Sequence, residues 1–142
     1  MDSLSESDYK PDFEIADKYI SFSSELLRLS LLAISALGAF IMLSLKSGDA
    51  QVTMNTTDKY LLFITMIAFA LASGAALAHR FWASDSLSYH VAYLRKKTQE
   101  EKDGRRLCFK NAARFMILSE YFFGFGIFFF ALTIFVILLI HN

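Results

Sequence analysis

The chain has 142 residues, 55% of them hydrophobic, and its 14 basic and 14 acidic side chains leave no formal net charge. Soluble domains of this size are usually about 45–50% apolar, so the composition argues against a soluble domain. The single cysteine excludes an internal disulfide bond and a cysteine-based metal site within one chain.

The hydrophobic residues are concentrated in three segments, 29–45, 60–78 and 115–140, in which Glu120 is the only charged residue. A helix needs about 20 mostly apolar residues to cross the roughly 30 Å hydrocarbon core of a bilayer. A soluble helical bundle would have to bury three segments that lack the polar face of a surface helix. We therefore predict an all-α integral membrane protein with three transmembrane helices, over residues 26–45, 60–79 and 115–140.

Residues 1–25 form an acidic tail, with seven acidic and two basic side chains. Pro11, followed by Asp12 and Glu14, is typical of a helix start. An apolar stripe with helical spacing follows, at Ile15, Tyr19, Phe22, Leu26 and Leu29. We expect an N-terminal amphipathic helix here, which either lies at the membrane surface or runs straight into the first span.

The loop over residues 46–59 is short and polar, and it holds two basic residues. Ser47, Gly48 and Asp49 are typical of a turn, and Thr57 or Asp58 can cap the next helix. The second loop, over residues 80–114, holds nine basic and four acidic residues. Lysine and arginine favour the cytoplasmic side in short loops. We therefore predict a multi-pass protein of the inner (plasma) membrane, with a cytoplasmic N-terminus, an external first loop and an external C-terminus.

The basic second loop is expected to contain an interfacial helix that Ser84 and Asp85 cap and that Gly104 ends. The ten residues after Gly104 are too few to return from a helix that stands out in solvent, so we expect the helix to lie along the headgroups. The acidic tail and anionic lipid are alternative partners for this loop. The side chains expected to contact headgroups are Arg80, Trp82, Arg95, Lys96, Lys97, Arg105 and Arg106.

Small residues recur every four positions in the second span, in two series. Small residues at this spacing let two helix backbones approach closely in lipid, although the helix propensity of alanine offers a simpler explanation. We predict that the second span is the helix against which the other two pack. The expected helix-packing residues are Ala68, Ala70, Ala72, Gly74, Ala76, Ala78, Gly124 and Ala131.

Glu120 lies five residues inside the third span, about 7.5 Å along a helix, where an ionisable residue suggests a function. Arg28 lies at a similar depth in the first span. One interpretation is an ion pair between Glu120 and Arg28 that joins the first and third spans. The other places Glu120 near the headgroups, with Arg28 paired to Glu25. A proton relay through Glu120 is a third hypothesis.

His79, Asp85 and His90 suggest a metal site, but their spacing argues against one. The two histidines are 11 residues apart, about 16 Å along one helix, whereas histidine ligands usually stand four residues apart. Cys108 lies among basic residues that can lower the pKa of a thiol, but no histidine base is near in sequence. We expect no metal site, no cofactor and no catalytic residues.

The run His79-Arg80-Phe81-Trp82-Ala83-Ser84-Asp85-Ser86 resembles a pattern in small bacterial three-span membrane proteins, and this resemblance implies no particular activity. The layout is also similar to that of prokaryotic diacylglycerol kinase. That family carries a glutamate and asparagine set at the cytoplasmic end of its second span, where residues 75–79 here hold alanine, leucine and histidine. The catalytic groups are missing, so we reject this function.

The leading hypothesis is a small non-enzymatic membrane protein that acts through assembly. It is an oligomeric membrane effector, with a pore as one version, or an accessory subunit of a membrane complex. The alternative is a membrane enzyme or transporter that uses Glu120, Arg28 and His79. The expected partners are the lipid bilayer, further copies of the chain or the subunits of a complex, and no nucleic acid.

Overall fold

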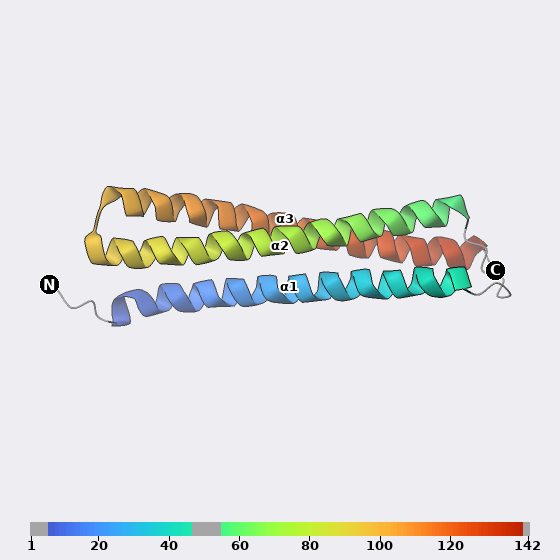
Figure 1. Ribbon diagram of the computed structural model, residues 1–142, viewed down its shortest axis with the longest axis horizontal. Coiled ribbons are helices and arrows are strands. Elements are labelled where there is room, and N and C mark those ends of the chain that lie inside the picture. Colours follow the sequence, from blue (N-terminus) through green and yellow to red (C-terminus); the bar gives the residue numbers. More distant parts are fainter. Residues whose placement is uncertain (1–5, 47–54, 141–142) are drawn as a thin grey trace.

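Three helices of nearly equal length lie side by side in the computed structural model, which describes residues 6–46 and 55–140 (Figure 1). They are α1 (Glu6–Lys46), α2 (Thr56–Lys96) and α3 (Gln99–Ile140), and α2 runs antiparallel to the other two. Among the described residues only Asn55, Lys97 and Thr98 are not helical. Each helix is long and apolar enough to cross a membrane. The prediction of an all-α membrane protein with three spans is confirmed.

Each helix is longer than a bilayer requires. At 1.5 Å per residue the 41 residues of α1 or α2 extend over about 60 Å, whereas the hydrocarbon core is roughly 30 Å thick. The apolar segments occupy one half of the bundle and most charged residues the other half. We call this polar half, which contains the turn between α2 and α3, the hairpin end. Its helices continue the spans well beyond the hydrocarbon core.

The hairpin end does not contain the separate interfacial helix that was expected between the second and third spans. Residues 84–96 belong to α2, and α3 begins at Gln99. Ser84 does not start a new helix, because α2 runs through it without a break, and its carbonyl oxygen accepts a hydrogen bond from the Ser88 hydroxyl at 3.1 Å. The turn falls at Lys97, which is left-handed (φ 53°, ψ 32°) and donates its N–H to the Tyr93 carbonyl at 2.7 Å. A turn at this position gives two legs of similar length, which removes the expected problem of the short return path.

Gly104 does not end a helix, as the sequence suggested, but lies inside α3. A Cβ atom at this position would lie 2.8 Å from the ring of Tyr89 on α2. Such a contact is too short for any ordinary side chain, so the glycine allows the Tyr89 ring to lie directly on the backbone of α3. Close packing of the two legs, rather than helix termination, is the structural reason for this glycine.

Two expected helix starts are also corrected. Pro11 lies inside α1, which begins at Glu6, so proline does not occupy the first helical position. Pro11 is the sixth residue of α1, beyond the first four amide groups that have no intrahelical partner, so it removes one backbone hydrogen bond in the second turn. Asn55 caps α2 in a capping box with Asp58, which serves as its partner and not as the cap. The expected turn at residues 47–49 lies outside the described residues.

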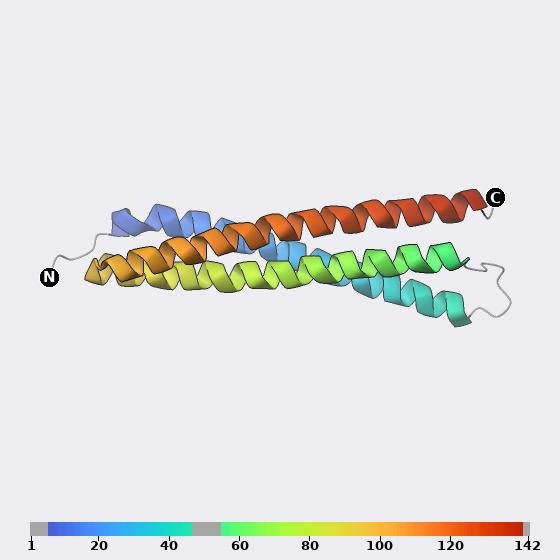
Figure 2. The same ribbon diagram turned by 90° about the horizontal axis from the view of Figure 1, so that it is seen from above.

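The central helix is α2, which packs against both other helices, as predicted from its small residues. Figures 1 and 2 together show that α1 and α3 cross near the middle of the bundle and lie apart at both ends. Leu37 of α1 forms a buried cluster with Leu62 and Phe69 of α2. Phe123 of α3 meets the Phe69 ring edge-on, with ring centroids 5.7 Å apart.

The interior of the bundle carries small hydroxyl side chains, whereas large apolar side chains cover the exterior. Ser30 and Thr65 are fully buried, and each hydroxyl donates to the carbonyl four residues earlier in its own helix, at 2.7 and 2.8 Å. These hydroxyls need no partner from another helix. Phe63, Phe128 and Leu139 are more than 60% exposed. This distribution is the reverse of that in soluble proteins and suits an exterior in contact with lipid.

Candidate functional site

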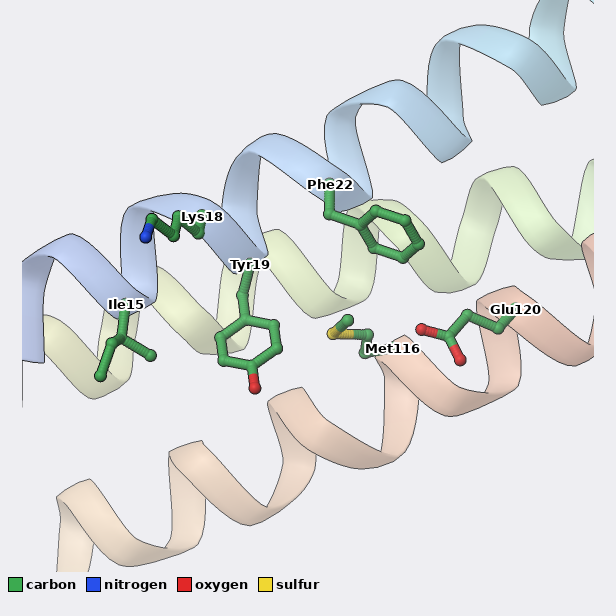
Figure 3. A pocket seen from close by; sticks show the side chains of 6 residues that line it. All are labelled: Ile15, Lys18, Tyr19, Phe22, Met116 and Glu120. Atoms are coloured by element: carbon green, nitrogen blue, oxygen red, sulfur yellow. The ribbon is translucent and has the colours of Figure 1, made fainter.

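An open groove of about 420 Å³ runs between α1 and α3 at the border of the hairpin end. Its lining residues are Ile15, Lys18, Tyr19, Phe22, Met116 and Glu120 (Figure 3). The N-terminal apolar stripe contributes most of this lining. Its members in the groove, Ile15, Tyr19 and Phe22, remain 46–55% exposed because α1 and α3 touch little in this region.

Glu120 provides the carboxylate of this groove, and Figure 3 shows its side chain extending along the groove toward Met116. Its side chain is exposed, and within the described residues no ion pair joins Glu120 to Arg28. Arg28 is likewise exposed and makes no ion pair with Glu25 in the same part of the chain. Neither of the two partners considered for Arg28 is therefore in contact with it.

The position of Arg28 on α1 explains why it does not meet Glu120 in the same chain. Leu26 and Ser30 are buried and face α2. Arg28 lies two residues from each of them, which is about 200° around a helix of 3.6 residues per turn. It therefore points away from the bundle, whereas Glu120 points into the groove.

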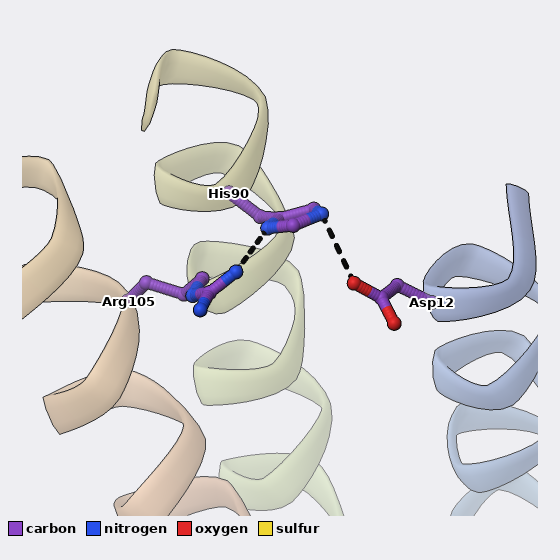
Figure 4. Close-up of polar contacts among 3 residues, drawn as sticks. All are labelled: Asp12, His90 and Arg105. Atoms are coloured by element: carbon purple, nitrogen blue, oxygen red, sulfur yellow. Dashed lines mark hydrogen bonds and ion pairs between the residues drawn. The ribbon is translucent and has the colours of Figure 1, made fainter. Parts of the chain in front are cut away.

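A second polar site joins all three helices at the hairpin end (Figure 4). Arg105 of α3 donates from Nη1 to Nδ1 of His90 on α2, at 2.6 Å, and His90 Nε2 lies 3.4 Å from Asp12 Oδ2 on α1. An arginine N–H can only donate, so Nδ1 accepts and the ring proton lies on Nε2, facing Asp12. The Phe13 ring lies 6.2 Å from the His90 ring, and the Arg105 guanidinium lies 5.7 Å from the centre of the Tyr93 ring.

The surroundings of His90 favour its neutral form. Burial lowers the pKa of His90 below the usual 6.5, the Arg105 guanidinium lowers it further, and Asp12 opposes both effects. His90 stands 11 residues beyond the span over residues 60–79, in the part of α2 that projects from the membrane. Protonation would place an N–H against the N–H of Arg105 and break their hydrogen bond. The acidic start of α1 and the basic hairpin thus meet through a neutral imidazole.

His79 stands on the same face of α2 but has a different partner. Its Nδ1 lies 2.9 Å from the carbonyl oxygen of Ala112 on α3, so this nitrogen carries the proton. The other nitrogen, Nε2, is buried without a hydrogen-bond partner. Among the described residues no three His, Cys, Asp or Glu side chains come together as metal ligands. The two histidines are fixed separately, each to α3.

The two series of small residues in α2 face different surroundings. Ala72 and Ala76 are fully buried, Ala68 is 7% exposed, and the Ser119 hydroxyl of α3 donates to the Ala72 carbonyl at 3.2 Å. In the other series, Ala70 and Gly74 are exposed and Ala78 is partly buried. Gly124 and Ala131 of α3 are also exposed. For these outward residues a packing role stays a prediction that needs a further helix.

Gly126, which sequence reasoning did not single out, lies directly against the Phe69 ring of α2. A Cβ atom there would lie 2.7 Å from the Phe69 ring. The sequence offers one signal, two glycines in Gly124-Phe125-Gly126 amid large aromatic residues. It does not tell which glycine faces the bundle, and Gly124 has open space around it.

The residues expected at the headgroups are spread along the whole hairpin. Arg80 is exposed, and the half-buried Trp82 ring packs edge-on against Phe81 at 5.6 Å. Lys97 lies 17 residues beyond Arg80, about 25 Å further along the helix axis. Headgroup contact stays a prediction for all seven residues, of which Arg95, Lys96 and Arg106 are exposed and Arg105 is partly buried in the His90 site.

Cys108 faces the interior of the hairpin and is only 4% exposed. Burial, together with the nearby Asp85 carboxylate, raises the pKa of its thiol. The neighbouring basic residues do not lower this pKa: Arg105 is bonded to His90, and Arg106 and Lys110 are exposed while the thiol is buried. A thiol reagent can reach Cys108 only when the hairpin opens.

The three groups considered for an enzyme or transporter do not share a site. His79 faces α3 inside the hairpin, Glu120 faces the groove, and Arg28 faces outward from α1. Comparison of the chain with protein-family models, with curated proteins and with solved structures finds no match in any of the three. The groove and its unpaired charges are thus the features on which a function can be based.

Proposed function

We propose that this chain is a small non-enzymatic membrane protein that acts by assembling with other membrane chains. It is either a homo-oligomeric effector or an accessory subunit of a larger complex. The observation that carries this proposal is Glu120, an exposed carboxylate inside the third span that has no ion pair within the described residues. Ionisable residues at membrane depth are costly and usually pair with another group in the protein interior. A neighbouring chain that covers the groove would supply such a group.

The apolar wall of the groove supports the same proposal. Ile15 and Tyr19 stand 11 and 7 residues before the span at residues 26–45, yet they are 55% and 47% exposed. In this position they are too far along α1 to be covered by the hydrocarbon core. Exposed apolar patches on the polar part of a protein commonly mark contacts with another protein or a membrane surface.

We further propose a bacterial inner membrane as the location, with the hairpin end in the cytoplasm and the C-terminus outside. The nine basic residues of the hairpin against two in the first loop support this orientation. The short resemblance of residues 79–86 to bacterial three-span proteins supports the location. A pore is one version of the effector, and it would need several copies because the space between the three helices is a pocket with an apolar lining that includes Leu37, Leu62 and Phe69.

Mass measurement in mild detergent tests the proposal. The full-length chain is extracted from its membrane, and its protein mass is measured by light scattering with the detergent contribution subtracted. A defined homo-oligomer supports the effector, and one copy bound to a stoichiometric second protein supports the accessory subunit. A monomer without a partner, both in detergent and after cross-linking in the intact membrane, contradicts the proposal.

A further inference from the structure

We infer that the groove between α1 and α3 binds a second copy of this chain, whose Arg28 pairs with Glu120. This inference rests on the proposed function, because it specifies which surface joins the copies. It also restores the ion pair that the sequence suggested, as a contact between chains and not within one.

Opposite charge is the first observation that supports the pairing. Glu120 and Arg28 are both exposed, both lie in or at the edge of a span, and neither has an ion pair within the described residues. An arginine fits a carboxylate especially well, because its planar guanidinium donates two parallel hydrogen bonds. Each charge in one copy therefore lacks the partner that the other copy carries.

The depth of Arg28 follows from contacts along α1 and α2. Asp12 of α1 lies beside His90 of α2. Arg28 follows Asp12 by 16 residues, and Gly74 precedes His90 by the same number, since the two helices are antiparallel. Arg28 is therefore level with Gly74.

The depth of Glu120 follows from contacts between α2 and α3. The Ser119 hydroxyl donates to the Ala72 carbonyl at 3.2 Å, so Glu120 is level with Ala72 or the residue before it. Gly74, which marks the level of Arg28, is two or three residues away, or roughly 3–5 Å along the axis. Copies that stand side by side at the same height in the membrane bring Arg28 and Glu120 to nearly equal depth.

The face of α1 around Arg28 carries both small and large exposed side chains. The side of α1 that carries Arg28 also carries Ser21, Ser35 and Ala39, which are 7 or 11 residues away and therefore share its face. All three are exposed and small, whereas Leu32, four residues after Arg28 on the same face, is large and 58% exposed. Small side chains let a helix enter a groove between two others, as in close helix pairs in lipid.

The two charges lie on different faces of one copy, so each copy contacts two different neighbours. Such head-to-tail contacts close into rings when the rotation between copies permits. All copies must also share one orientation in the membrane, which a ring with its axis along the membrane normal satisfies. The expected assembly is a closed ring and not a two-fold dimer.

Charge reversal tests the pairing. We compare the oligomer mass of the full chain with that of R28E, E120R and the double variant R28E/E120R. Each single reversal places like charges together and should weaken association about tenfold or more, and the double reversal should restore it. K102E is the control, because Lys102 is an exposed charge of the hairpin 18 residues before Glu120, and its mass should equal that of the unchanged chain. Circular dichroism spectra and melting temperatures show whether each variant is folded, and R28Q and E120Q test the lost attraction without repulsion.

Cross-linking tests the head-to-tail geometry. In a C108A background, R28C and E120C are coexpressed and treated with a short bifunctional maleimide. The mixture should give cross-linked dimers, and either cysteine variant alone should give few.

The outcomes separate the inference from the proposed function. A monomeric unchanged chain without a partner overturns both. A homo-oligomer whose mass is unchanged by all reversals overturns the inference and leaves assembly standing. Native mass spectrometry that finds an amine-bearing phospholipid lost from E120R, with unchanged oligomer mass, assigns the groove to lipid and also overturns the inference.

Discussion

The interface between α2 and α3 differs from that between α1 and α3 in nearly every physical respect. Between α2 and α3, Gly104 and Gly126 accept aromatic rings directly on the backbone, and His79 and Ser119 form hydrogen bonds across it. Between α1 and α3, large apolar side chains stay half exposed beside an unpaired carboxylate. The first interface is complete within one chain, and the second has the features of a surface that awaits another chain.

The helix common to both interfaces, α3, is thus packed in two ways: closely against α2 and loosely against α1. Small residues and backbone contacts specify the α2–α3 hairpin, whereas α1 packs on α2 through side chains such as Asp12 with His90 and Leu37 with Phe69, and hardly touches α3. Substitutions in the hairpin should therefore change folding. Substitutions in the groove should change association.

The largest effect is expected from A72L, inside the complete interface. Ala72 has no exposed surface, so a larger side chain must separate α2 from α3, at a cost of about 2–3 kcal/mol of folding stability. Thermal unfolding in detergent measures this loss. The control is G74L, on the open side of α2, which should leave folding stability unchanged or raise it by up to about 1 kcal/mol, because leucine is a better helix former than glycine. Equal losses in both variants would contradict the distinction between the two faces.

A smaller effect is expected from the two glycines of α3. In G126A the added methyl group meets the Phe69 ring, and strain should outweigh the helix propensity of alanine, with a net loss of about 1 kcal/mol. In G124A the methyl group enters open space, so the melting temperature should be unchanged or higher. Chemical unfolding of both variants in the same detergent measures the difference. A more stable G126A would show that the ring moves aside without cost.

Acid should loosen the attachment of α1 at the hairpin end. Because the pKa of His90 is lowered in the folded chain, the unfolded chain binds more protons as pH falls. The contribution of His90 to stability is therefore full above pH of about 6.5 and is lost as pH falls below it toward the lowered value. Melting temperatures between pH 8 and pH 5 should fall in this window, and H90Q should reduce the fall. A chain that is more stable at pH 5.5 than at pH 7.5 would indicate that Asp12 dominates over burial and Arg105.

Orientation in the membrane can be tested with almost no effect on stability. Native Cys108 is unsuitable because it is buried, so the reporter is K102C in a C108A background, where Lys102 is exposed. An impermeant maleimide should label it in lysed cells and not in intact cells, if the hairpin end is cytoplasmic. Unchanged Cys108 should stay unlabelled in both. Labelling of K102C in intact cells would reverse the proposed orientation.

The spans and the central place of α2 were predictable from the sequence, because long apolar segments and regular small residues are local patterns. The turn between α2 and α3 was not, because Gly104 is a stronger signal for a helix end than Lys97, a residue type that rarely adopts positive φ. Tertiary packing of Tyr89 on Gly104 overrode that signal.

The candidate site was predictable in part. The charge of Glu120 and its unusual depth are visible in the sequence, and so is the opposite sign of the acidic tail and basic hairpin. The face on which Arg28 lies depends on which residues of α1 contact α2. The contacts among Asp12, His90 and Arg105 depend on how the three helices are aligned along the bundle axis. Such long-range positions leave no local pattern.

The uninterrupted passage of α2 from the span to Lys96 has a mechanical consequence. Without a joint at the membrane surface, the projecting part of the helix acts as a lever whose base is set by the bilayer. A helix adapts to a change in bilayer thickness by tilting. If the projecting part of α2, about 25 Å long, tilts by about 20°, its tip moves sideways by roughly 9 Å. The position of the basic turn at Lys97, at a distance from the membrane, therefore depends on the tilt angle of the span in the bilayer.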